Sequence, residues 1–264
     1  MSVRMVMSFL RRDLRVMRSY RAAMLGQVVG TLLFLASFAV VAPIISDDFG
    51  DEYGAGYIAF AAVGIAVTGA LLSALQAFSD SVREAQLEGT LEAILMAPVR
   101  REAVVAAMGA YPLLAGTVAA GLTLGVAAAL AGGFDVHPVS ALLALAVSLA
   151  AFAALGLLSA AVVLVVKRGN PLATLVGMVG AVTAGAYAPV DTFPGWLQAI
   201  AAINPMTYAL DAWRSATLLG EGPADVAGDL AVLLVVALVV GPLSWGVLRR
   251  AIDVARRDGT LITY

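Results

Sequence analysis

The sequence contains no cysteine, a single lysine and few charged residues of either sign. The absence of cysteine excludes a disulfide framework, a thiolate metal site and a cysteine nucleophile. Charged residues make up 13% of the 264 residues and hydrophobic residues 61%, whereas soluble domains have about 25% and about 45–50%. This composition excludes a soluble single domain and a disordered chain, and it indicates an integral membrane protein.

The motifs of an enzyme or an ion carrier are also missing. The only lysine, Lys167, follows Val166 rather than glycine, so the phosphate-binding pattern G-x-x-x-x-G-K-[ST] does not occur. The single histidine, His137, stands beside Pro138 and is best interpreted as a solvated turn residue. No charged residue interrupts the long apolar runs, although ion carriers usually keep one at mid-membrane. We therefore predict no catalytic residue, no metal site and no cofactor bound by this chain.

Six charge-free runs are each long enough to cross a hydrocarbon core of about 30 Å as a helix. A charge at mid-bilayer costs at least about 2.5 kcal/mol, which explains why these runs exclude charge. A cleaved signal peptide is the alternative for the first run, but the run is too long and no small-residue cleavage site follows. We predict an all-α integral membrane protein with six spans, Ala22–Ser46, Tyr53–Ser79, Ala103–Phe134, Val136–Val166, Gly169–Val190 and Leu230–Leu248.

The basic residues determine the expected orientation. With the N-terminus inside, six spans place 15 of the 16 basic residues in the cytoplasm and only Arg214 outside. Positively charged loops stay on the cytoplasmic side. We expect a multi-pass protein of the cell membrane with both termini in the cytoplasm, the C-terminal tail being residues 253–264.

Residues 1–21 are predicted to form an amphipathic helix on the cytoplasmic membrane surface. At 100° per residue, one stripe carries four arginines and the opposite face carries apolar residues. A basic stripe is attracted to anionic lipid headgroups, so membrane lipid is an expected partner. The stripe consists of Arg4, Arg11, Arg15 and Arg18, and the apolar face of Val6, Phe9, Met17 and Tyr20.

A charged segment at 80–102 separates the second and third predicted spans. At helical spacing one face is apolar, with Leu87, Leu91, Ile94 and Leu95. A second face is acidic, with Glu84, Glu88 and Glu92. The segment could rest on lipid, but an acidic stripe matches an anionic leaflet poorly. An amphipathic helix of this kind is better suited to a groove in a partner protein.

The external stretch 189–225 is predicted to form a re-entrant or interfacial helical hairpin between spans five and six. Asn204 followed by Pro205 is typical of a helix start, which places a helix from Met206 to about Leu219. In this helix Asp211 and Arg214 have the i, i+3 spacing of an ion pair. The preceding apolar piece of about ten residues is too short to span, and the aromatic residues nearby suit the membrane interface; they are Trp196, Tyr208 and Trp213.

The order of these motifs resembles the permease subunits of type-2 ABC exporters, whose relatives include daunorubicin-resistance and lipo-oligosaccharide permeases. The cytoplasmic segment Glu84-Ala85-Gln86-Leu87-Glu88-Gly89-Thr90-Leu91-Glu92 followed by Ala97-Pro98-Val99-Arg100-Arg101 is similar to the family's E-x-G-T-L-E…P-V-x-R segment. So are the stretches Tyr187–Leu197 and Asn204–Arg214. The resemblance covers nearly the whole chain and implies a type-2 ABC transmembrane domain at 22–252.

The resemblance implies a permease without enzymatic activity, paired with a second copy or a homologue and with two copies of a separate ABC ATPase. ATP and Mg would bind to the ATPase, and no nucleic acid is involved. The segment around Glu84–Glu92 would be the coupling helix, and spans one, two and five would line the route. Coupling residues would be Glu84, Leu87, Glu88, Gly89, Thr90, Leu91, Glu92, Leu95, Arg100 and Arg101.

The route and its outer gate are expected to use the mild polar residues of the spans and the external hairpin. Such hydroxyls and amides often only join packed helices, so contact with substrate is the less common role. The expected residues are Gln27, Thr31, Thr68, Thr183, Tyr187, Pro189, Pro194, Trp196, Asn204, Pro205, Tyr208, Asp211 and Arg214. The cargo would be drug-like, a lipid or a glycan. The alternative is a non-ABC polytopic membrane protein such as a secondary carrier.

Overall fold

The computed structural model describes residues 56–96, 100–131, 133–166 and 170–257, together with seven single helical positions between 26 and 37. Within this part of the chain all regular structure is helical. The predicted interface helix at 1–21 and the residues Gln27 and Thr31 lie outside the described residues. The helices are α4 (Gly56–Leu87), α5 (Leu91–Leu95), α6 (Arg101–Met108), α7 (Ala110–Ala131), α8 (Pro138–Val166), α9 (Pro171–Thr183), the 3-10 turn η1 (Val190–Thr192), α10 (Gly195–Ala201), α11 (Pro205–Thr217) and α12 (Ala227–Arg257).

Four stretches are long and apolar enough to cross a membrane, namely Gly56–Leu87, Arg101–Ala129, Pro138–Val165 and Ala227–Ala255. They correspond to the second, third, fourth and sixth predicted spans. Helix α12 continues to Arg257, so the first residues of the predicted tail at 253–264 are helical, and the cytoplasmic position of this tail stays a prediction. Large apolar side chains of these helices are exposed along the sides of the bundle, among them Leu122, Leu142 and Leu238. Such side chains are suited to contact with lipid.

The fifth predicted span differs from expectation. Helix α9 begins at Pro171 with Asn170 as its cap and ends at Thr183, so the expected continuation to Val190 is wrong. Thirteen helical residues rise about 20 Å, which is less than a hydrocarbon core of about 30 Å. The chain turns at Gly185, whose φ is +76°. Most of the first predicted span lies outside the described residues, and six spans remain a prediction.

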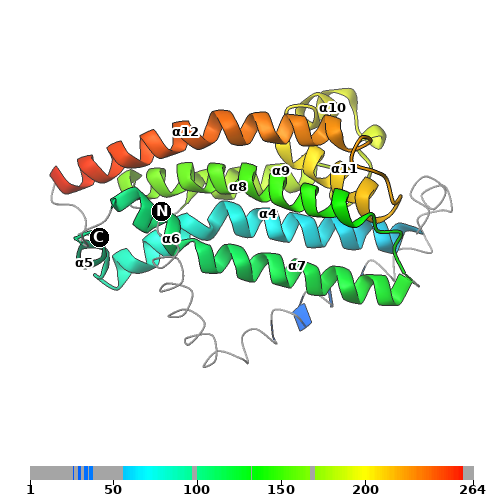
Figure 1. The fold of residues 1–264 in the computed structure, drawn as a ribbon, viewed down its shortest axis with the longest axis horizontal. Helices are drawn as coiled ribbons and strands as arrows, with labels where there is room; N and C mark the ends of the chain where they lie inside the picture. Colours follow the sequence, from blue (N-terminus) through cyan, green and yellow to red (C-terminus); the bar gives the residue numbers. More distant parts are fainter. Residues whose placement is uncertain are drawn as a thin grey trace.

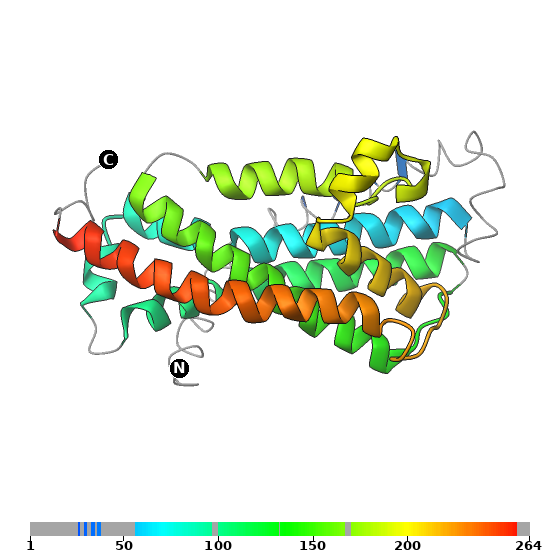
Figure 2. The ribbon, with the colours of Figure 1, turned by 90° about the horizontal axis from the view of Figure 1, so that it is seen from above.

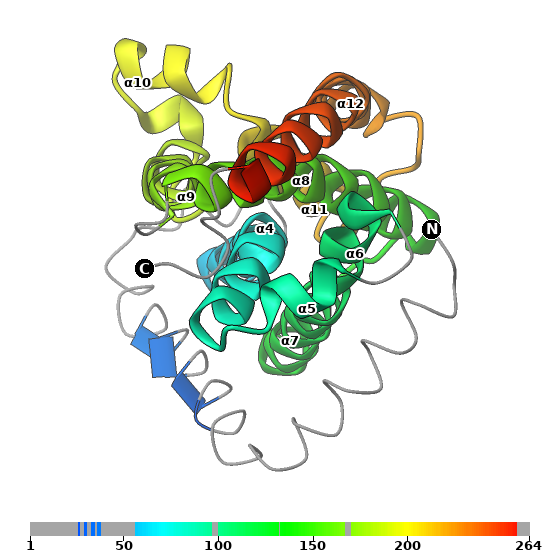
Figure 3. The same cartoon turned by 90° about the vertical axis from the view of Figure 1, so that its left-hand side faces the viewer.

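Helix α4 occupies the centre of the bundle and packs against α7, α8 and α11 (Figure 1, Figure 3). It is buried along most of its length, and small residues dominate its contact faces. Gly156 of α8 crosses so close to α4 that a Cβ there would lie 2.6 Å from the Ala74 carbonyl oxygen. Small residues allow helices to approach in this way. The alanine and glycine content of the sequence therefore serves the close packing of these helices.

Different helices and loops lie at the two ends of the bundle (Figure 2). At one end lie α5 and the C-terminal ends of α4, α8 and α12, and at the other lie α10, α11 and the loop before α8. We call them the α5 end and the α10 end. The α5 end carries the arginines Arg83, Arg100, Arg101, Arg249, Arg250 and Arg257 together with the acidic residues Asp80, Glu84, Glu88, Glu92, Glu102 and Asp253, whereas the α10 end carries Arg214 and the acidic residues Asp135, Asp191, Asp211, Glu221, Asp225 and Asp229. This sorting is the one that the predicted orientation requires, with the α5 end in the cytoplasm.

Polar links hold the α5 end together. The amide of Asn170 donates to Ser79 Oγ and accepts from Ser159 Oγ at 2.6 Å, which joins α9 to α4 and α8. Glu102 is buried, and its Oε1 lies 3.6 Å from Nε of Arg249, which joins α6 to α12. Buried polar groups need such partners. At the α5 end these contacts therefore link α9 to α4 and α8, and α6 to α12.

Candidate functional site

The predicted coupling segment is not one helix. Helix α4 continues through Leu87, so its last two turns include the first part of the segment. The chain then turns, with φ of +68° at Gly89, and α5 begins at Leu91. A positive φ suits glycine, which has no Cβ, and it ends a helix. The single helix expected from Glu84 to Glu92 is therefore wrong, because the turn at Gly89 divides it.

The turn also separates the leucines that were expected to share one face. Leu87 is 64% exposed, whereas Leu91 and Leu95 are 1% and 4% exposed. The two buried leucines pack in the core of this end, in a cluster that contains Val104 of α6 and Leu248 of α12. The expectation that Leu91 and Leu95 meet a partner protein is therefore wrong.

What remains exposed is a compact surface at the junction of α4 and α5. It has two large apolar side chains, Leu87 and Met96, and Met96 is 78% exposed. Glu84, Glu88 and Glu92 are also exposed, in the last turns of α4, the turn after it and the first turn of α5. We call this set the α4–α5 surface; its other members are Gly89, Thr90 and Ala93.

The two arginines of the predicted coupling set lie at the start of α6. Arg100 is exposed and precedes the helix, and Arg101 lies 3.9 Å from Asp253 of α12 through its Nη1. Exposed ion pairs of this kind contribute at most about 1 kcal/mol. Arg100 is thus available at the edge of the α5 end, whereas Arg101 links α6 to α12.

The α10 end is organised around Arg214 of α11, which is 2% exposed. Its Nη2 donates to the carbonyl oxygens of Gly185 at 2.9 Å and Ala186 at 3.2 Å. Its guanidinium carbon lies 3.6 Å from the centre of the Phe60 ring in α4. A buried charge is costly without such compensation. Arg214 therefore joins three parts of the chain.

Two glycines make the Arg214 contact possible. A Cβ at Gly64 of α4 would overlap the Ala186 carbonyl oxygen and lie 3.2 Å from Nη2 of Arg214. Gly185 has a φ of +76°, and a Cβ there would lie 2.7 Å from Val190 Cγ2. Backbone therefore approaches α4 directly at Gly64. The sequence reasoning missed Phe60, Gly64 and Gly185, because nothing in a run of alanine and glycine marks which glycine faces another backbone.

The predicted ion pair between Asp211 and Arg214 does not form. In the described part of the chain the structure contains no salt bridge within 4.0 Å between these two side chains. Burial raises the pKa of the Asp211 carboxyl to about 6, the Arg214 charge lowers it, and the charge of Asp229 raises it. The i, i+3 spacing is correct, but Arg214 turns inward to the carbonyls that follow α9.

The predicted start of α11 is confirmed, and it connects to the end of α9. Asn204 caps the helix by accepting from the Met206 backbone N–H at 3.0 Å, and Pro205 is its first residue. The same amide donates to the Gly180 carbonyl and to Thr183 Oγ1, both at 2.9 Å. The structure thus brings Asn204 and Thr183 together.

The other predicted outer residues lie in different places. Tyr187 accepts a hydrogen bond from the Tyr57 hydroxyl at 3.2 Å and contacts the Phe34 ring edge-on at 6.4 Å. Thr68 is buried inside the bundle. Pro189 caps η1 and Pro194 caps α10. Trp196 is 68% exposed, and the Tyr208 hydroxyl donates to the Ala202 carbonyl at 2.6 Å.

Around α10 and α11 the chain forms two short helices joined by a turn, and their re-entry into a membrane remains a prediction. The described residues contain no group of three His, Cys, Asp or Glu side chains that could hold a metal ion.

The comparison with known families agrees with this architecture. The model of the ABC-2 type transporter family matches residues 2–218, which is more than half of the chain. No curated protein matches the chain. The matched family consists of membrane components of ABC transporters. The chain therefore belongs to the ABC-2 type transporter family and is a membrane permease.

Proposed function

We propose that this chain is the permease subunit of an ATP-driven exporter and that the α4–α5 surface binds a separate ABC ATPase. Two permease copies, or one copy and a homologue, would assemble with two ATPase copies, which bind ATP and Mg. The family membership supports this assignment. The observation that carries it is the exposure of Leu87 and Met96 near three exposed carboxylates at the α5 end of the bundle.

The α4–α5 surface has the composition of a docking site. Leaving a large apolar side chain in water is less favourable than burying it by about 1.5–3 kcal/mol of free energy. The surface exposes two such side chains, Leu87 and Met96. A groove in a partner protein would remove them from water, and basic residues at its rim would attract Glu84, Glu88 and Glu92. Leu91 and Leu95 do not belong to this surface, because they are buried in a hydrophobic core cluster of the chain itself. The partner therefore meets a preformed surface rather than a free helix.

Helix α4 connects this surface to the α10 end. Leu87 is its last residue, and Phe60 and Gly64 lie in its first three turns, where Arg214 and Ala186 contact them. The helix has 32 residues and is about 48 Å long. A displacement of Leu87 by the ATPase would be carried along one continuous helix. We infer that α4 transmits the ATPase motion to the outer gate, through which a drug-like, lipid or glycan cargo leaves.

The test uses this chain co-expressed with the ABC ATPase proposed as its partner. Leu87→Ala and Glu88→Lys should each weaken their association, by about thirtyfold for a buried anchor that contributes about 2 kcal/mol. Leu142→Ala is the matched control, because Leu142 is 66% exposed on the side of α8. Full association and full ATP-dependent transport in both variants would contradict the proposal.

A further inference from the structure

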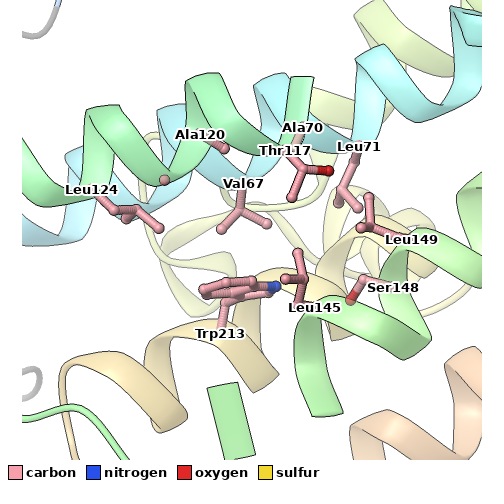
Figure 4. A pocket seen from close by; sticks show the side chains of 11 residues that line it. Val67, Ala70, Leu71, Thr117, Ala120, Leu124, Leu145, Ser148, Leu149 and Trp213 are labelled. Atoms are coloured by element: carbon pink, nitrogen blue, oxygen red, sulfur yellow. The ribbon is translucent and has the colours of Figure 1, made fainter. Parts of the chain in front are cut away.

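A cavity of about 80 Å³ lies inside the bundle, away from both the α4–α5 surface and the Arg214 contact. Its lining residues belong to α4, α7, α8 and α11 (Figure 4). Its wall is mainly apolar and consists chiefly of Val67 and Leu71 of α4, Ala120 and Leu124 of α7, Leu145 of α8 and Trp213 of α11. These residues lie in the half of the bundle nearer the α10 end.

One end of the cavity is polar. Ser148 of α8 is fully buried, and its Oγ has no hydrogen-bond partner among the described residues. The Thr117 hydroxyl also lines the cavity, but it donates to the Leu113 carbonyl at 2.8 Å and can only accept from a ligand. The indole nitrogen of Trp213 lies at the end of its ring nearest Leu145 and Ser148 (Figure 4).

The absence of a hydrogen-bond partner for the buried Ser148 hydroxyl is an argument for a ligand. A serine within a helix commonly donates to a carbonyl of the preceding turn, but Ser148 does not. A buried hydroxyl left without a partner costs about 1–3 kcal/mol. A group that can both accept and donate, such as another hydroxyl, would satisfy Ser148. The apolar wall excludes a charged ligand, because nothing there would compensate its charge.

The size of the cavity limits the ligand. Cavities of about 150 Å³ accept benzene, so a cavity of about 80 Å³ takes a smaller molecule. Gly121 at its edge is exposed, and a Cβ there would meet no atom within 4 Å. Leu122 and Val118, beside it on α7, are exposed apolar residues. The cavity therefore has an edge on the side that is suited to lipid, from which an uncharged solute could enter.

We propose that this cavity is a binding site for a small uncharged alcohol of about two to four carbons, with its alkyl part against Leu71 and Leu145 and its hydroxyl on Ser148. The site is separate from the proposed docking of the ATPase and does not depend on it. An occupant would contact α4 and α11, the two helices that Arg214 joins. Small alcohols dissolved in the membrane would thereby bind inside the permease.

The test uses the full chain in lipid nanodiscs. Trp196→Phe and Trp245→Phe leave Trp213 as the only tryptophan, so that the tryptophan fluorescence reports on the cavity. The ligand pair is 2-bromoethanol and bromoethane, which differ in the hydroxyl and both quench tryptophan through bromine. We expect saturable quenching by both. Ser148→Ala should lower the affinity for 2-bromoethanol about fivefold, because one hydrogen bond is lost, and should leave the affinity for bromoethane unchanged.

A second pair of variants tests the cavity itself. Ala120→Leu fills it and should abolish saturable quenching. Val118→Leu, at a position that is 52% exposed on the same helix, should retain it. Quenching that rises linearly and equally in all variants would show partitioning into lipid only and would overturn the site. Saturable quenching that Ser148→Ala leaves unchanged for both ligands would overturn the hydroxyl contact, even if Ala120→Leu fails to fold.

Discussion

The guanidinium of Arg214 stacks on the ring of Phe60, with the guanidinium carbon 3.6 Å from the ring centroid. The same side chain donates to the carbonyls of Gly185 and Ala186 beyond the end of α9. One cation thus connects α4, α11 and the turn after α9. The contact explains how a charged residue is accommodated inside an apolar bundle, and it links the α10 end to the helix that reaches the α4–α5 surface.

The Arg214–Phe60 contact should be measurable as a coupling energy. Buried cation–π pairs contribute about 2 kcal/mol, and neighbouring mutations do not add when their side chains interact. We expect a double-mutant cycle with Arg214→Met and Phe60→Leu to give a coupling of about 1–2 kcal/mol in the free energy of unfolding. Strictly additive effects, measured by thermal unfolding in the same lipid, would contradict the stacking.

Gly64 and Gly69 should respond oppositely to the same change. A Cβ at Gly64 would overlap the Ala186 carbonyl oxygen, whereas one at Gly69 would meet no atom within 4 Å. In a helix interior, alanine is favoured over glycine by about 0.5–1 kcal/mol. We expect Gly64→Ala to lower the Tm and Gly69→Ala to keep or raise it. Equal Tm values for the two variants would argue against close contact between α4 and the turn.

Asp211 should make stability depend on pH. Its pKa in the folded chain is raised to about 6, chiefly by burial, so the folded state binds more protons than the unfolded state between about pH 4 and 6. Its contribution to stability is therefore present below pH 4 and is lost as the pH rises through 6. Asp211→Asn should raise the Tm at pH 8 and change it little at pH 4. A Tm gain that is the same at both pH values would exclude this origin.

The predicted orientation can be tested cleanly because the chain contains no native cysteine. Ala93 at the α5 end and Ala224 at the α10 end are both exposed, which makes Ala93→Cys and Ala224→Cys a matched pair. In intact cells an impermeant thiol reagent should label position 224 and should reach position 93 only after the membrane is permeabilised. External labelling of position 93 would reverse the assignment of the two ends.

Several local signals in the sequence predicted the local structure correctly, although the fifth charge-free run did not. Charge-free runs predicted the helices that are long enough to cross a membrane, because the cost of a charge in lipid acts on each run separately. The Asn204–Pro205 start of α11 was predictable because a cap involves only neighbouring residues, here Asn204 and the N–H of Met206. The composition and the motif order were likewise sufficient to suggest the family that the comparison shows.

The predictions that failed concern directions set by distant contacts. Helical periodicity placed Leu87 and Leu91 on one face, but the turn at Gly89 directs Leu91 into contact with α6 and α12. The i, i+3 spacing paired Arg214 with Asp211, but two free carbonyls beyond α9 and an aromatic ring in α4 are better partners for the buried cation. Neither contact can be read from spacing along the chain.

Site-specific photo-crosslinking from position 87 tests the central claim most directly. A photoreactive amino acid replaces Leu87 in one variant and Leu122, which is exposed on the side of α7, in the other. Both variants are expressed with the ABC ATPase proposed as the partner. Irradiation should attach the ATPase to position 87 and not to position 122, with the adduct identified by mass spectrometry. No ATPase adduct at position 87, or an equal yield at position 122, would contradict the assignment of the α4–α5 surface as the site of ATPase docking.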